Sequence, residues 1–162
     1  MKRLCACACL IAGLCVALAA QAAGIVSCSV SATGPVFGTY APLSATPAYA
    51  NGTVQASCTL LSGSETKINL VLSYSTGVSG IYSTRTMASG ANRLTYNLFN
   101  DSAYTQISGD GTGGSQTNSA SFVMNNGHPT QTSSSTIYGR IPAGQDVGAG
   151  SYTDTIVVTI TY

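Results

Sequence analysis

Charged side chains are scarce in this sequence. They make up 7% of its 162 residues, whereas about a quarter is usual for a soluble domain. The six basic and five acidic residues nearly cancel, which excludes a basic nucleic-acid surface and disorder caused by charge repulsion. Glu- and Lys-rich heptads of the coiled-coil type are also missing. Tryptophan is absent and histidine occurs once, whereas the chain holds 21 Ser, 20 Thr and 18 Gly. Hydroxyl groups therefore take the place of charge.

The first segment has the pattern of an export signal. Lys2 and Arg3 precede an apolar run over residues 4–20, and Ala20-Gln21-Ala22 forms an A-x-A cleavage motif. We therefore expect a signal peptide over residues 1–22, cleaved between Ala22 and Ala23. A transmembrane anchor is the alternative, but a run of about 17 residues lies at the lower limit for crossing a bilayer. The mature chain is expected to have no membrane span.

The expected mature chain, residues 23–162, has the length of a single domain. It keeps four basic and five acidic residues, so its net charge is 4 − 5 = −1. Two of the six cysteines remain, Cys28 and Cys58. In an exported protein this pair predicts one disulfide, worth about 3–4 kcal/mol in the chain-entropy model. Two free thiols and a metal site are the alternatives, although one histidine offers a metal site little support.

A lipidation motif is another alternative at the same cysteine. Ile25-Val26-Ser27-Cys28 resembles a bacterial lipobox, with a small residue directly before Cys28. The apolar core of the leader, however, ends at Ala20, and lipidation of Cys28 would leave Cys58 unpaired. We therefore favour the disulfide.

Apolar and polar residues alternate along most of the mature chain, which is the pattern of half-buried strands. Turn-forming residues separate the runs, including Asn51-Gly52 and Asn126-Gly127. Strands at this spacing indicate an all-β fold consisting of a single β-sandwich. The predicted strands span residues 53–60, 68–74, 94–98 and 156–162, with shorter candidates at 28–32, 119–124 and 134–141.

Residues that could carry chemistry are few. The segment Gly109–Gly114 fits the spelling G-x-G-x-x-G, but no helix pattern follows it, so we expect a loop. His128 precedes Pro129 in a turn and is expected to be solvated. The scattered aspartates are expected to cap turn amides, and Arg140 is expected to make a cross-strand contact or salt bridge. We predict no catalytic residues, no cofactor and no metal, and hence no enzyme.

Several blocks of the sequence resemble the spore coat protein U domain family. The most specific block is Tyr138-Gly139-Arg140-Ile141-Pro142-Ala143-Gly144-Gln145. The resemblance covers residues 24–162, essentially the whole mature chain. The other matching blocks are residues 37–43, 110–113, 150–154 and 158–162.

The resemblance implies a structural subunit rather than an enzyme. The family includes subunits of archaic chaperone–usher pili and a founding member from a bacterial spore coat. Its fold is an incomplete immunoglobulin-like sandwich that lacks its last strand. A periplasmic chaperone fills the gap first, and the N-terminal extension of the next subunit then replaces it. The implied partners are a chaperone, an usher and neighbouring subunits, with a glycan or surface receptor as a further candidate. The implied destination is the cell surface, reached through the periplasm, with a role in adhesion or biofilm formation.

The last predicted strand is the expected joint with a partner strand, because it runs to the final residue with nothing after it to cover an open edge. Its edge and core face consist of Ile156, Val158, Ile160 and Tyr162. The tail before Cys28 offers only Ile25 and Val26 as donor residues. Residues 23–27 span about 17 Å when extended, so we expect a poor strand donor, as at a pilus tip or in a minor subunit.

Two other functions remain open. A self-contained coat or matrix protein would have a complete sandwich, with residues 28–32 covering the edge at residues 151–162. A carbohydrate-binding module would use exposed tyrosines, such as Tyr49, Tyr82 or Tyr104, as stacking platforms.

Overall fold

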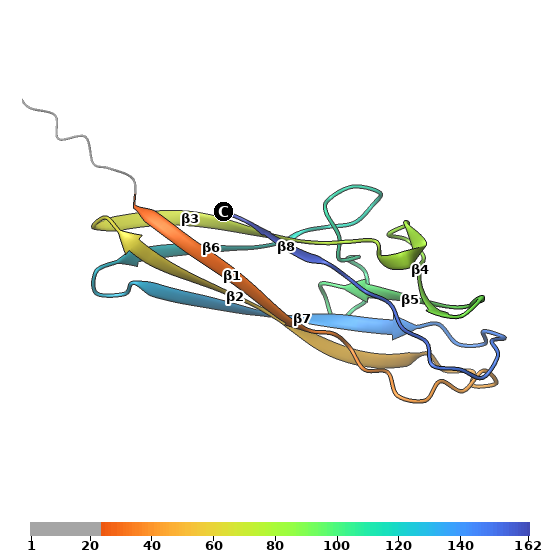
Figure 1. The fold of residues 1–162 in the computed structure, drawn as a ribbon. Helices are drawn as coiled ribbons and strands as arrows, with labels where there is room; N and C mark the ends of the chain where they lie inside the picture. Colours follow the sequence, from red (N-terminus) through yellow and green to blue (C-terminus); the bar gives the residue numbers. More distant parts are fainter. Residues whose placement is uncertain (1–23) are drawn as a thin grey trace, which may run out of the picture.

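The computed structural model describes residues 24–162. The predicted signal peptide, with its cleavage site between Ala22 and Ala23, lies outside the described residues. Within them no helix is long and apolar enough to cross a bilayer. Eight strands and one short 3-10 turn form an elongated body (Figure 1). The elements are β1 (Ile25–Thr33), β2 (Ala48–Ser62), β3 (Glu65–Tyr74), η1 (Gly77–Ser79), β4 (Arg85–Ser89), β5 (Asn92–Phe99), β6 (Asn118–Asn125), β7 (Thr130–Ile141) and β8 (Val158–Thr161).

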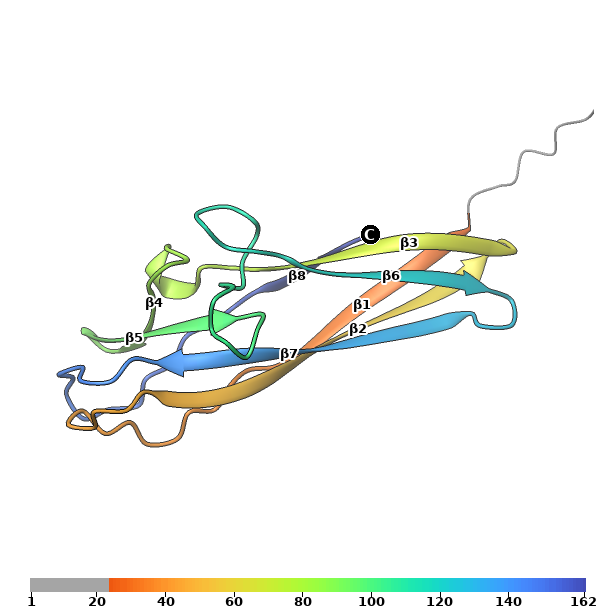
Figure 2. The same ribbon diagram turned by 180° about the vertical axis from the view of Figure 1, so that it is seen from behind.

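The strands form two sheets that face each other. One sheet has five strands in the order β1-β2-β7-β5-β4, and the other has three in the order β6-β3-β8. All paired neighbours are antiparallel. Figure 2 shows from behind that β3 and β6 run along one side of the body and β2 and β7 along the other. The predicted all-β sandwich is confirmed.

The core lies between the sheets and is built from the alternating residues that the sequence singled out. In β2 the residues Val54, Ala56, Cys58 and Leu60 are buried, and the intervening ones face outward. The same alternation buries one face of β3 and of β5, although Asn97 and Phe99 on the other face of β5 are buried as well. The further buried members are Leu70, Leu72, Tyr74, Leu94, Tyr96 and Leu98.

The predicted disulfide is present. Cys28 of β1 and Cys58 of β2 are bonded and are register partners in the ladder between these strands. The bridge therefore fastens β1, an edge strand, to the interior of its sheet.

Two features differ from the sequence-based expectations. Asn51-Gly52 was expected to form a turn, and this expectation is wrong, because both residues lie inside β2 and pair with β7. At Gly52 a Cβ atom would lie 2.5 Å from the carbonyl oxygen of Thr33 and would clash with it. Glycine is therefore needed here because two backbone segments approach closely, and not because the chain turns. The second difference is β4, which the alternation did not predict. By contrast, Asn126-Gly127 does lie in the turn between β6 and β7.

The alternation of apolar residues does not predict β4 because the inward face of this strand begins with an arginine. Arg85 is fully buried, with 0% of its surface exposed. Its guanidinium donates to the carbonyl oxygens of Ser75 and Ser108, at 2.9 and 2.6 Å, and to Oδ1 of Asn97 at 2.8 Å. Burial lowers the pKa of this guanidinium. Arg85 thus ties β4 and β5 to the loops that follow β3 and β5.

Candidate functional site

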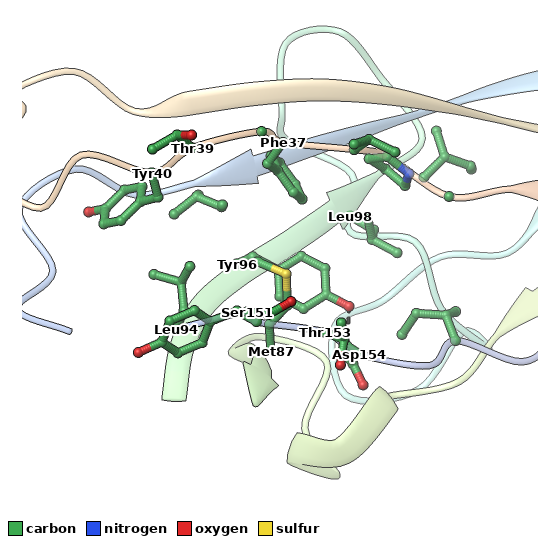
Figure 3. Close-up of a pocket in the computed structure, with 18 of the residues that line it drawn as sticks. Phe37, Thr39, Tyr40, Met87, Leu94, Tyr96, Leu98, Ser151, Thr153 and Asp154 are labelled. Atoms are coloured by element: carbon green, nitrogen blue, oxygen red, sulfur yellow. Dashed lines mark hydrogen bonds between the residues drawn. The ribbon is translucent and has the colours of Figure 1, made fainter. Parts of the chain in front are cut away.

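A large apolar groove opens between the two sheets. Its volume is about 1160 Å³, and two irregular segments form its rims: residues 32–42, which begin in β1 and continue beyond it, and residues 147–158, which lead into β8. Figure 3 shows the side chains of Phe37 and Tyr40 on one rim and those of Ser151, Thr153 and Asp154 on the other. The side chains on the floor are mainly apolar. They include Val54, Met87, Leu94, Tyr96, Leu98, Ile137 and Ile141. We call this feature the open groove.

The strands that flank the open groove are incompletely covered. The inward side chains of β1, which are Val26, Cys28 and Val30, are only partly buried. The inward Val158 and Ile160 of β8 are also partly buried. In the adjacent strands, β2 and β3, most of the side chains on the same face are fully buried. The core therefore lacks cover between β1 and β8.

The backbone edges at the open groove lack a neighbour as well. β1 ends one sheet and β8 ends the other, and no ladder joins them within residues 24–162. One hydrogen bond crosses between them, from the amide of Cys28 to the hydroxyl of Tyr162 at 3.3 Å. The complete-sandwich alternative required residues 28–32 to cover the edge at residues 151–162. The structure contradicts that pairing, because among the described residues β1 is paired only with β2 and β8 only with β3, each at the end of a different sheet.

Two of the family-like sequence blocks meet at one rim of the open groove. The hydroxyl of Tyr40 donates to the carbonyl oxygen of Pro142 at 2.9 Å and accepts the amide of Gln145 at 2.9 Å. Phe37 packs edge-on against Tyr96, with ring centroids 6.1 Å apart. A Cβ atom at Gly139 would lie 2.6 Å from the ring of Phe37. These contacts explain the tyrosine and the glycine. The glutamine is explained by its side chain, which accepts the amide of Thr95 at 2.7 Å and donates to the carbonyl oxygen of Thr95 at 2.8 Å.

The opposite rim is held by Asp154. Its carboxylate accepts the hydroxyl of Tyr96 at 2.7 Å, and it also accepts the amides of Val78 at 2.9 Å and Thr155 at 2.8 Å. Burial, together with the neighbouring Asp154 carboxylate, raises the pKa of the Tyr96 hydroxyl far above its usual value. Tyr96 is therefore a stable proton donor, and it anchors the rim to the floor of the groove. The expected capping role of Asp154 is confirmed.

The four residues predicted to form the edge and core face of the last strand do not all line the open groove. Ile156 and Val158 line the open groove. Ile160 lies further along β8, where it is partly buried, and Tyr162 is 54% exposed. The predicted donor residues are part of β1: Ile25 is 61% exposed and pairs with Ser62, and Val26 pairs with Leu60. In this arrangement neither residue extends away from the domain.

Of the remaining candidates, Arg140 lies in β7 and makes a cross-strand contact with the ring of Phe99 in β5, whereas Asp110 and His128 occupy loops. Asp110 accepts the amide and hydroxyl of Thr112 within the Gly109–Gly114 segment, at 2.9 and 2.6 Å. His128 is exposed in the turn between β6 and β7, where it exchanges backbone hydrogen bonds with Asn125. In residues 24–162 no three His, Cys, Asp or Glu side chains gather closely enough to share a metal ion.

Comparison with known proteins places this fold in a family. No curated protein sequence is significantly similar to the chain. Among solved structures, it is similar to the crystal structure of the CsuC–CsuE chaperone–tip adhesion subunit pre-assembly complex from the archaic chaperone–usher Csu pili of Acinetobacter baumannii, with 19% identity and a TM-score of 0.49. The match covers 85% of this chain and 40% of that chain, so the protein spans less than half of the structure that it resembles. The sequence profile of the Spore Coat Protein U domain matches residues 14–159. The chain therefore belongs to the Spore Coat Protein U domain family.

Proposed function

We propose that this protein is an exported structural subunit of a bacterial surface pilus, and that its open groove accepts a β-strand from another chain. The observation that carries the proposal is the groove itself, an apolar cleft whose two rims continue into β1 and β8, strands that each have one edge unpaired within the described chain. Family membership agrees with a structural role. We further propose that residues 1–22 form a cleaved signal peptide and that the protein passes through the periplasm, whose oxidising conditions suit the Cys28–Cys58 disulfide.

The open groove lacks a backbone partner for its strand edges and cover for its partly buried side chains, and an inserted strand would supply both. Its backbone would pair with an open edge, and its alternate side chains would cover the partly buried residues of β1 and β8. Each large apolar side chain that is fully buried contributes about 1.5–3 kcal/mol. A few such side chains would therefore stabilise the domain by an amount comparable to the whole folding free energy of a typical domain.

The inserted strand is expected to come from a different chain, and this chain is expected to be a poor strand donor in return. Ile25 and Val26 already pair with β2, so using them as donors would require the start of β1 to leave its sheet. We therefore propose an acceptor that is a poor donor, as expected for a tip or minor subunit. A periplasmic chaperone would fill the groove first and a neighbouring subunit would follow, with an usher as the assembly partner. Adhesion or biofilm formation is the proposed outcome of assembly.

The first test uses a peptide as a surrogate strand. A nine-residue peptide of alternating Val and Thr should raise the Tm of the full mature chain in proportion to the logarithm of its concentration, because it binds the folded state alone. A peptide of the same composition with the valines clustered serves as the control. A Tm that responds to neither peptide, in a chain that is stable and monomeric, would refute the strand-accepting groove.

The second test uses two neighbouring valines on opposite faces of one segment. Val158 lines the open groove, whereas Val157 is 60% exposed. Val158→Asp should abolish stabilisation by the peptide and co-purification with a co-expressed chaperone, because it places a charge in the apolar groove. Val157→Asp should leave both unchanged. Equal effects of the two substitutions would show that the strand binds elsewhere.

Adhesion needs its own measurement. Cells that lack this protein should form less biofilm, and complementation with the Val158→Asp variant should fail to restore it. Restoration by that variant would separate any adhesive role from strand insertion.

A further inference from the structure

We propose that the outer face of the five-stranded sheet binds acidic sugars, with Arg140 taking the sugar's carboxylate and neighbouring tyrosines packing against its ring. The site, called here the aromatic site, consists of Tyr49, Tyr104, Tyr138 and Arg140. It lies on the face of β7 that points away from the core: Ile137, Gly139 and Ile141 are buried, whereas Tyr138 and Arg140 alternate with them. It is therefore separate from the open groove.

Three segments distant in sequence bring the aromatic site together. Tyr49 of β2 is the register partner of Arg140 in β7, and Tyr138 lies two residues earlier on the same face. Tyr104 reaches over from the loop after β5. Its ring centroid lies 4.8 Å from that of Tyr49 and 6.2 Å from that of Tyr138. Tyr49 stays 52% exposed, so its ring is available to a ligand.

Arg140 is placed to bind an anion. Its guanidinium carbon lies 5.1 Å from the ring centre of Phe99 and 5.7 Å from that of Tyr104. Contacts with ring faces leave the in-plane N–H groups of a guanidinium free for a carboxylate. Within residues 24–162 Arg140 makes no hydrogen bond to a protein acceptor, whereas Arg85 and Arg93 donate to carbonyl oxygens. The five donors of Arg140 are therefore unused by the fold.

The loop that carries Tyr104 is held in an unusual conformation. Tyr104 has a φ of 58°, and it is the one non-glycine residue with positive φ in the described part of the chain. The Asp101 carboxylate holds the loop by accepting the amides of Thr105 at 3.0 Å and Gln106 at 2.7 Å. Such backbone strain is concentrated at functional sites. Here it positions the Tyr104 ring beside Arg140 and Tyr49.

A small cavity beside the aromatic site can receive the sugar hydroxyls. Its volume is about 270 Å³, and Tyr104 and Arg140 line it. Hydroxyl-bearing Ser83, Thr95 and Thr105 also contribute to its wall. This volume lies near the lower end of ligand cavities, about 300 Å³, and so suits a single sugar unit.

These features together select a pyranose that carries a carboxylate. The carboxylate can accept two parallel N–H bonds from Arg140, the strong bidentate arrangement. The C–H face of the ring can pack against the tyrosines, and the ring hydroxyls can bond with the cavity wall. A neutral sugar would leave Arg140 unpaired, and a small carboxylate would leave the tyrosines uncovered.

The test titrates the full mature chain with three probes and follows binding by NMR. D-Glucuronate should bind at least about ten-fold more tightly than either D-glucose or acetate, since each of these lacks one half of the recognition. Added salt should weaken glucuronate binding. Equal binding of glucuronate and acetate, or of glucuronate and glucose, would overturn the proposal.

Matched arginine variants locate the site. Arg140→Gln should weaken glucuronate binding at least about ten-fold, the loss expected for a charge-assisted hydrogen bond. Arg93→Gln, at an exposed arginine of the same sheet, should leave binding unchanged. Unchanged binding by Arg140→Gln, or an equal loss in both variants, would refute the assignment.

A surface substitution keeps the test valid if Arg140→Gln fails to fold. Tyr49→Ala should weaken glucuronate binding without unfolding the protein, because Tyr49 is half exposed, and Tyr49→Phe should retain binding. Full binding by Tyr49→Ala would contradict the stacking role. The groove variant Val158→Asp should bind glucuronate normally, so the sugar site and the proposed strand insertion succeed or fail independently.

Discussion

Replacing the buried Arg85 is the sharpest test of how this fold is held together. Arg85→Met keeps an unbranched side chain of similar reach but removes every donor. The carbonyl oxygens of Ser75 and Ser108, and Oδ1 of Asn97, would then lose the guanidinium that they share. Because Arg85 has no exposed surface, water cannot easily replace those donors.

The magnitude follows mainly from the two carbonyl oxygens, because Oδ1 of Asn97 keeps the amide of Leu98 as a donor at 2.9 Å. Leaving a buried polar group unsatisfied costs about 1–3 kcal/mol, and the variant is relieved of burying a charge, which offsets part of that loss. We therefore expect the free energy of unfolding to fall by about 3–5 kcal/mol, which places the change among the largest for single substitutions.

Urea unfolding measures this change. With an m-value of about 1–3 kcal/mol/M, typical of a small protein, the midpoint should move down by more than about 1 M. The valine–threonine peptide is held at one fixed concentration throughout, so that groove occupancy does not vary. Arg93→Met is the control, and because Arg93 is exposed it should change stability by no more than about 0.5 kcal/mol. A loss below about 1 kcal/mol for Arg85→Met would refute the view that this guanidinium ties the loops together.

Three further predictions concern other parts of the structure. Replacing both Cys28 and Cys58 by serine should lower the free energy of unfolding by about 3–4 kcal/mol; thermal melting measures this, and a reductant should have no further effect on the variant. The raised pKa of Tyr96 keeps it protonated in the folded state while the unfolded chain ionises, so this contribution to stability is complete below pH 10 and declines above it. In urea titrations at pH 9 to 11, Tyr96→Phe should therefore show a shallower alkaline loss than the parent; an identical slope would contradict the assignment. Gly139→Ala should cost about 1–3 kcal/mol by overpacking against Phe37, whereas Gly144→Ala, where nothing lies within 4 Å, should cost only the strain of its positive φ; calorimetry of both variants compares them.

Much of the core was predictable because a strand over a core repeats every two residues. The alternating residues of β2, β3 and β5 were assigned to the inner face from sequence, and those singled out are buried, apart from Ile68, which is partly buried. The disulfide followed from the count of cysteines that would remain after the leader. Neither inference depends on which strands lie beside each other, and so the sequence was sufficient.

The predictions from sequence were wrong where contacts between distant segments override the local structural preference of the residues. Asn51-Gly52 has the composition of a hairpin turn, but the close approach of Thr33 uses that glycine inside β2. β4 was missed because Arg85 occupies an inward position, and its burial is possible only through acceptors from segments remote in sequence.

The aromatic site depended on tertiary structure for the same reason. Tyr49 and Tyr104 were singled out as candidates, but their proximity to each other and to Arg140 depends on the register of β2 against β7 and on the path of the loop after β5. The sequence placed no constraint on either.

By itself, the sequence determined the all-β class, the inner face of most strands and the cysteine pair, because these follow from side-chain period and residue type. Only the tertiary structure decided that β1 pairs with β2 and not with β8, which leaves the open groove between them. Strand pairing is a choice among competing non-local contacts, and an alternating pattern fits any of several partners equally well.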